Sequence, residues 1–101
     1  MIMPPAAGPI DPWKIEEVRK YLAKAFPGGR FDDYPRGGAA AHLFVVTESG
    51  GVQQHQKKHH LLVTRHFFER FTDHAALGYT LHAEGVGKSL ERAGERTVEL
   101  Y

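Results

Sequence analysis

Cysteine is absent from the 101 residues of this chain. That absence excludes a disulfide framework, a thiolate nucleophile, a cysteine-ligated zinc ion and an iron–sulfur cluster. Long apolar runs are missing as well, because residues 43–46 and 61–63 are the longest and ~20 residues are needed to cross a bilayer. The first nine residues lack the basic and apolar regions of a signal peptide. We therefore expect no membrane span and, by default, a cytoplasmic protein.

A strong charge of either sign is also absent. Thirteen Lys and Arg residues stand against twelve Asp and Glu residues, which gives a formal net charge of +1. This balance argues against a protein that holds nucleic acid mainly by bulk charge. The charge is unevenly distributed, however, because residues 13–30 and 53–70 each carry a net charge of +3 while residues 71–101 carry −2. Any basic surface must come from the first two segments.

Length and composition predict one small globular domain. The apolar fraction of 42% and the charged fraction of 25% are close to the averages for soluble domains. A chain of this size can bury one modest hydrophobic core. Residues 1–9 contain three of the six prolines and no periodic apolar pattern, so we predict a flexible arm there. Residues 10–101 then form a single domain.

The first regular element is a predicted helix that begins at Pro12. Asp11 suits the N-cap position, and Ile10 and Ile15 are spaced as a hydrophobic staple across that cap. Apolar residues then recur at helical spacing until Pro27, Gly28 and Gly29 end the helix. They form one stripe of Ile15, Val18, Leu22, Ala25 and Phe26.

Strands are predicted for residues 41–48 and 59–64, where branched and aromatic residues alternate with others. A short edge strand over residues 30–34 precedes them, followed by a turn over residues 35–38. Two connections around Gly50 compete: a tight hairpin at the glycines, or a loop that runs through Lys58. The apolar pattern favours the loop, since only then does the segment 43–46 lie beside the segment 61–63.

Helical segments and a final strand complete the predicted order. Phe67, Phe68 and Phe71 are spaced for one or two helical turns after Thr64, and Thr72 or Asp73 caps a second helix. Glycines predict a break near residues 85–87 and a C-cap at Gly94. Residues 97–101 alternate as a strand does. The fold class is therefore α+β in two layers, an antiparallel sheet of three or four strands with an N-terminal helix and a later helical segment packed on it.

Seven histidines are the first candidates for chemistry. A metal or acid–base site around His42, His55, His59 and His60 is conceivable, because neutral imidazole binds divalent ions. Lys57 and Lys58 would repel a cation, so a solvated basic loop is favoured. Asp33 and Tyr34 beside His42 suggest an acid–base cleft, but alternation turns only one of the paired carboxylates Asp32 and Asp33 inward, and a solvated pair near the turn is favoured.

The segment GVGKS at residues 85–89 imitates the end of a phosphate-binding loop. That motif requires an earlier glycine at position 82, which is His82, and a strand where a helix is predicted. A kink between helices explains the glycines better. No cofactor is predicted, and no hydroxyl lies in a recognisable nucleophile motif, so the sequence favours a non-enzymatic role.

Two binding functions remain. The leading prediction is a small interaction module, a homodimer or a protein-binding domain, that uses one face or edge of the sheet. Val45 and Leu62 are the candidate contacts on the face, and Tyr101 is the candidate at the edge. The alternative is weak nucleic-acid binding by basic residues of a hairpin loop and of the end of the first helix. Those residues are Lys20, Lys24, Arg30, Lys57 and Lys58.

Overall fold

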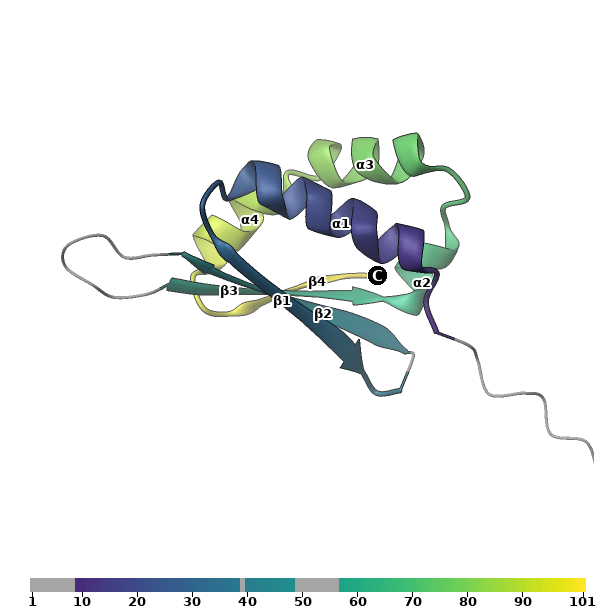
Figure 1. The fold of residues 1–101 in the computed structure, drawn as a ribbon, viewed down its shortest axis with the longest axis horizontal. Helices are drawn as coiled ribbons and strands as arrows, with labels where there is room; N and C mark the ends of the chain where they lie inside the picture. The colour runs from purple at the N-terminus through teal and green to yellow at the C-terminus, as the bar shows by residue number, and fades with distance from the viewer. Residues whose placement is uncertain (1–8, 39, 49–56) are drawn as a thin grey trace, which may run out of the picture.

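The computed structural model describes residues 9–38, 40–48 and 57–101. Its elements follow the predicted order of a helix, strands, helices and a last strand (Figure 1). In chain order they are α1 (Pro12–Ala25), β1 (Arg30–Arg36), β2 (Ala41–Glu48), β3 (Lys57–Thr64), α2 (Arg65–Glu69), α3 (His74–Ala83), α4 (Val86–Ala93) and β4 (Thr97–Leu100). The predicted α+β class is confirmed. Of the predicted arm, only Pro9 lies within the described residues.

The four strands form one sheet in the order β1-β2-β3-β4. The first three are antiparallel neighbours, whereas β4 lies parallel to β3. A parallel neighbour requires a crossover connection, and the segment from α2 to α4 supplies it. Leu43 pairs with Leu62 and Phe44 with Leu61, so the predicted pairing of the segments 43–46 and 61–63 is confirmed and the register of a tight hairpin at the glycines is wrong.

Strand boundaries differ from the sequence prediction in two places. β3 begins at Lys57 instead of residue 59, because Glu48 and Thr47 continue the ladder opposite Lys57 and Lys58. β1 is the predicted edge strand, but it continues through Pro35 to Arg36. Proline is tolerated there because an edge strand leaves one row of backbone groups unpaired. The two lysines therefore belong to a strand and not to the loop.

Helix boundaries follow the predicted caps. Thr64 Oγ1 accepts a hydrogen bond of 3.1 Å from the Phe67 amide, and Asp73 Oδ1 accepts one of 3.2 Å from the Ala75 amide. Gly85 separates α3 from α4 in a left-handed conformation with a φ of 62°, which glycine adopts without strain. The predicted break and its cause are both confirmed.

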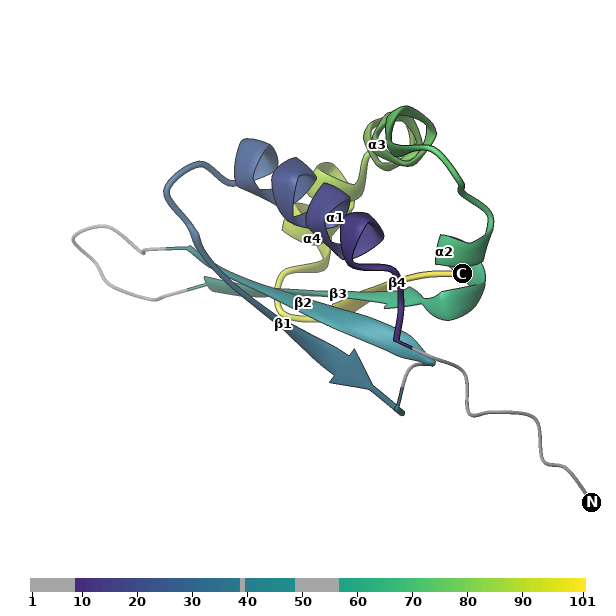
Figure 2. The same cartoon turned by 45° about the vertical axis from the view of Figure 1, so that its right-hand side comes forward.

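The helices lie on one side of the sheet, with α3 outside α1 (Figures 1 and 2). Alternate residues of the strands point toward them and form the core with Val18, Leu22 and Leu90. These inward strand residues are Phe44, Val46, Leu61, Val63, Val98 and Leu100.

The other side of the sheet we call the open face. By alternation it carries Arg30, Asp32, Tyr34 and Arg36 of β1, Ala41, Leu43, Val45 and Thr47 of β2, Lys58, His60, Leu62 and Thr64 of β3, and Thr97 and Glu99 of β4.

Two helical glycines have opposite surroundings and give a paired test of packing. A Cβ at Gly87 would lie 3.1 Å from Ala25 Cβ, whereas a Cβ at Gly78 would meet only Glu17 Oε2 at 3.4 Å. Gly78→Ala should raise the free energy of unfolding by about 0.5–1 kcal/mol through helix propensity. Gly87→Ala should lower it by about 1 kcal/mol, because overpacking outweighs the same gain. Urea denaturation measures both, and stabilisation by Gly87→Ala would contradict the close α1–α4 approach.

Candidate functional site

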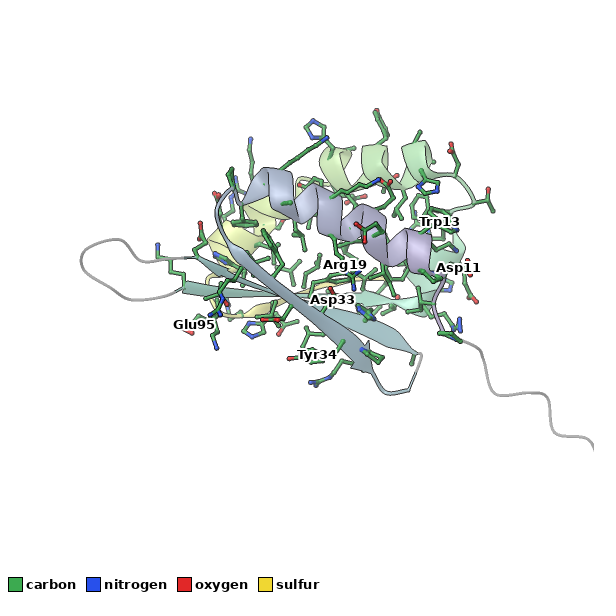
Figure 3. The ribbon with its side chains drawn as sticks, viewed as in Figure 1. Asp11, Trp13, Arg19, Asp33, Tyr34 and Glu95 are labelled. Carbon is green, nitrogen blue, oxygen red and sulfur yellow. The ribbon has the colours of Figure 1, made fainter. Side chains whose placement is uncertain are left out.

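A partly buried polar cluster joins α1 to the first two strands. Asp33, on the helix side of β1, accepts hydrogen bonds of 2.7 and 2.8 Å from Nε and Nη2 of Arg19, and its Oδ1 lies 2.7 Å from His42 Nε2. Glu16 holds the far side of the guanidinium at 3.1 Å. The side chains of Asp33 and His42 are only 9% and 8% exposed. Arg19 and Asp33 extend toward each other between helix and sheet in Figure 3.

Electrostatics in this cluster favour the charged forms of Arg19 and Asp33. The hydrogen bonds from Arg19 hold the pKa of Asp33 below its ordinary value, with a smaller contribution from His42, although burial opposes them. The same contact with Asp33 raises the pKa of Arg19. Alternation correctly predicted that one of the two aspartates points inward. The predicted solvated position of Asp33 is wrong, because its carboxylate binds the guanidinium of Arg19 on α1, a residue distant in sequence.

A second buried histidine links β2, β3 and α4. His59 is 2% exposed, and its Nε2 lies 2.7 Å from Glu48 Oε2 while its Nδ1 lies 3.1 Å from the carbonyl oxygen of Leu90. Both nitrogens are thus occupied by the protein, so this ring is placed to hold elements together and not to accept a substrate proton. The predicted solvated position of His59 is wrong.

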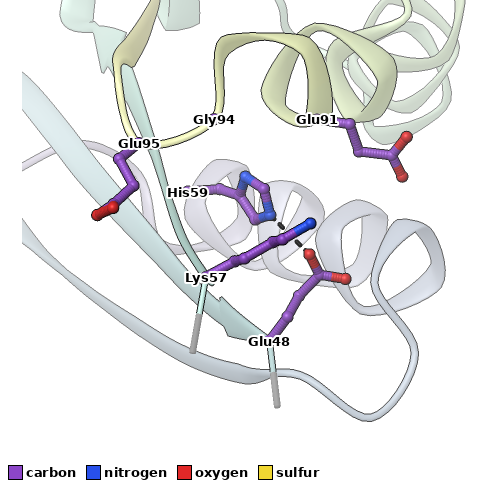
Figure 4. Close-up of a pocket in the computed structure, with 6 residues that line it drawn as sticks. All are labelled: Glu48, Lys57, His59, Glu91, Gly94 and Glu95. Carbon is purple, nitrogen blue, oxygen red and sulfur yellow. Dashed lines mark hydrogen bonds and ion pairs between the residues drawn. The ribbon is translucent and has the colours of Figure 1, made fainter. Parts of the chain in front are cut away.

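His59 forms one wall of a cavity of about 650 Å³ at the end of the sheet (Figure 4). Glutamates dominate the lining, with Lys57 the single cation among the residues that border it: Glu48, Lys57, His59, Glu91, Gly94 and Glu95. In Figure 4 the side chains of Glu91 and Glu95 extend away from the His59–Glu48 pair. The acidic residues therefore do not converge on one point.

The predicted histidine site is not assembled among the described residues. His42 and His59 lie on the helix side of the sheet in separate clusters, and His60 lies on the open face. His55 lies outside the described residues. Within residues 9–38, 40–48 and 57–101, no group of three or more potential ligands is placed to hold a metal ion.

The glycine motif serves helix packing. Gly87 donates its amide hydrogen to the hydroxyl of Tyr21 at 2.8 Å, and a helix, not a strand, precedes the segment. A phosphate-binding loop needs free backbone amides between a strand and a helix. The kink interpretation is therefore confirmed.

The predicted interface residues on the sheet lie together. Val45 and Leu62 are both partly buried on the open face, beside the buried Leu43. Neither Leu43 nor His60 was predicted for this face, although alternation from Val45 and Leu62 would have found both. Tyr101 follows β4, is exposed, and donates its hydroxyl to Glu99 at 2.8 Å, which raises the pKa of Tyr101.

The five predicted nucleic-acid contacts are divided between two sides of the molecule. Arg30 and Lys58 flank Thr47 in one row of the open face. Lys57 borders the glutamate-rich cavity, while Lys20 and Lys24 belong to α1, where Lys20 pairs with Glu17 at 3.7 Å. The five thus divide into one pair on the open face, one pair on α1 and Lys57 by itself, and nucleic-acid binding stays a prediction.

No family model matches the chain, and neither a curated protein nor a solved structure resembles it significantly. In the part of the chain that the structure describes, no helix is both long and apolar enough to span a membrane.

Proposed function

We propose that this chain is a non-enzymatic interaction module that pairs with a second copy of itself through the open face. The observation that carries the proposal is the one-sided cover of the sheet, since the described helices pack on the opposite side (Figures 1 and 2). Val45 and Leu62, which are only partly buried, form an apolar centre beside the buried Leu43 on the face that the helices leave uncovered. Apolar centres of this kind are removed from water when a second sheet packs against them.

Charges around this centre favour a second copy over a strongly acidic or basic partner. The rim of the open face carries Arg30, Arg36 and Lys58 together with Asp32 and Glu99. Charges of both signs allow a self-complementary contact in a two-fold dimer.

The edges of the sheet are less suited to pairing. β1 contains Pro35 and four charged residues, features that block strand addition. β4 offers only four residues, Thr97–Leu100. Packing of one sheet face against another therefore buries more apolar surface than strand pairing at an edge would. The proposed contact residues are thus Val45 and Leu62, and not Tyr101.

Leu62→Asp should weaken the dimer at least ~30-fold, because a carboxylate would be buried without a partner in an apolar interface. Light scattering over a concentration series measures the dissociation constant. The matched control is Tyr79→Asp, which adds the same charge at a residue that is 73% exposed on α3, away from the open face. The circular dichroism spectra of both variants must match that of the wild type.

Two results would overturn the proposal. One is a wild-type protein that stays monomeric up to millimolar concentration. The other is equal weakening by Leu62→Asp and Tyr79→Asp, which would assign the contact to a general charge effect and not to the open face.

A further inference from the structure

A groove between α1 and α3 is bordered mainly by charged and polar residues. Its volume is about 390 Å³, within the range of small-molecule sites. It lies on the helix side of the sheet, away from the open face, because α3 lies outside α1 (Figures 1 and 2). A ligand in this groove is therefore independent of the proposed dimer. The bordering residues are Glu17, Lys20, Tyr21, Lys24, Gly78 and His82.

The charges of this groove favour an anion. Lys20 and Lys24 are four residues apart on α1, so both side chains leave the same face of the helix. Glu17 is the one carboxylate among the described border residues, and it is shared between Lys20 Nζ at 3.7 Å and His74 Nδ1 at 3.1 Å. No carboxylate of the described chain pairs with Lys24. The groove therefore has positive charge that the described residues do not neutralise.

Gly78 leaves space for a ligand beside the backbone of α3. Glycine destabilises a helix interior relative to alanine, so its presence there has a cost. Packing of the described chain does not require it, because an added Cβ would meet only Glu17 Oε2, at 3.4 Å. A second wall is the ring of Tyr21, whose hydroxyl accepts a hydrogen bond of 2.8 Å from the Gly87 amide and so holds the ring in place.

The type of cation indicates the type of anion. Arginine presents a planar fork that matches a carboxylate, whereas the lysine ammonium is a point charge that suits the several oxygens of a phosphate group. Two lysines and no arginine are among the described border residues. A phosphate monoester has a second pKa of about 6, so near neutral pH it carries almost two negative charges. That charge matches the two ammonium groups.

From this arrangement we infer that the groove binds a small organic phosphate monoester. The phosphoryl group would lie between Lys20 and Lys24. His82 adds a donor from α3, since a histidine has at least one ring N–H in either protonation state. The carbon part of the ligand would occupy the space beside Gly78 and contact the ring of Tyr21. An inorganic phosphate ion would leave most of this volume unfilled.

The test compares three probes, each added to labelled protein at low ionic strength and about pH 7.5, where the monoester is doubly charged. Phenyl phosphate carries both recognised parts, benzoate keeps the ring but has a carboxylate, and inorganic phosphate lacks the ring. Amide resonances are followed by NMR. We expect saturable shifts centred on residues 17–24 and 78–82. Phenyl phosphate should bind at least about fivefold more tightly than either other probe.

A pair of lysine variants tests the position of the phosphoryl group. Lys24→Gln removes one ammonium group from the groove and should weaken phenyl phosphate binding about tenfold, as loss of a charge-assisted hydrogen bond does. Lys58→Gln removes the same charge from the open face and should change the affinity less than about twofold. Equal weakening by both variants would assign the binding to general charge attraction and overturn the inference.

A substitution at Gly78 tests the position of the carbon part. Gly78→Leu should fill the space beside α3 and weaken phenyl phosphate binding at least about tenfold, while the affinity for inorganic phosphate changes little. The midpoint temperature should not fall, because leucine favours a helix more than glycine does. Three results for the wild type would overturn the inference: absence of saturable shifts, benzoate bound as tightly as phenyl phosphate, or inorganic phosphate bound as tightly as phenyl phosphate.

Discussion

Leu61→Ala is expected to lower the free energy of unfolding by about 3–4 kcal/mol, the loss typical of a fully buried leucine. Leu61 is 0% exposed on β3, an inner strand, between Phe44 on β2 and Val98 on β4. Truncation would leave a cavity that strands on both sides prevent from closing. Urea denaturation followed by circular dichroism measures the loss, which would lower the midpoint temperature by about 12 °C or more.

The matched control is the neighbouring residue. Leu62→Ala makes the same chemical change on the same strand but on the open face, where the side chain is only partly buried. Its loss should be about 1 kcal/mol in dilute solution, where a dimer is dissociated. Equal losses for Leu61→Ala and Leu62→Ala at high dilution would mean that the open face is covered within a single chain, which would contradict the proposed dimer surface.

Asp33→Asn should cost about 2 kcal/mol at pH 7, because it removes a carboxylate that binds both Arg19 and His42. The loss is not larger, since Arg19 is half exposed and water screens part of the attraction. The effect should depend on pH in a defined direction. The pKa of Asp33 is lowered on folding, so its stabilisation is complete above the unfolded value near ~4 and is lost as pH falls through the lower folded value.

Unfolding free energies of wild type and Asp33→Asn should therefore differ most near neutrality and converge as the pH falls through the lowered pKa of Asp33 in the folded protein. Asp32→Asn provides the control, because Asp32 is exposed on the opposite side of the same strand. It should change stability by less than about 0.5 kcal/mol at either pH. A pH-independent loss in Asp33→Asn would show that shape, and not charge, accounts for the role of Asp33.

Much of the fold follows from local patterns. The helix from Pro12 to Ala25 is specified by a proline at its first turn and an apolar stripe, and the positions of the inner strands follow from alternating branched residues. The register of β2 and β3 was also accessible, because only one pairing brings their apolar segments together. The parallel direction of β4 was not predicted, since four alternating residues contain no information on direction.

The polar clusters escaped prediction for a different reason. Asp33 and His59 are polar residues beside turn or loop signals, and such residues are usually solvated. Their burial depends on partners distant in sequence, Arg19 for Asp33 and Glu48 and the Leu90 carbonyl for His59. Residues of the open face were only partly predictable, because alternation separates the two sides of each strand, whereas the register of β2 against β3 places Val45 and Leu62 on the same side.

The crossover to β4 has a consequence for the order in which the chain can assemble. β1, β2 and β3 follow one another as antiparallel neighbours, so their contacts close short lengths of chain and can form early. β4 must wait until α2, α3 and α4 have been made, because those helices carry it back to β3. Until then the edge of β3 that later pairs with β4 has no neighbouring strand, and Leu61 and Val63 lack their contacts with Val98 and Leu100. During synthesis, the pairing of β4 with β3 that protects this edge from other chains therefore forms after the other strand pairs.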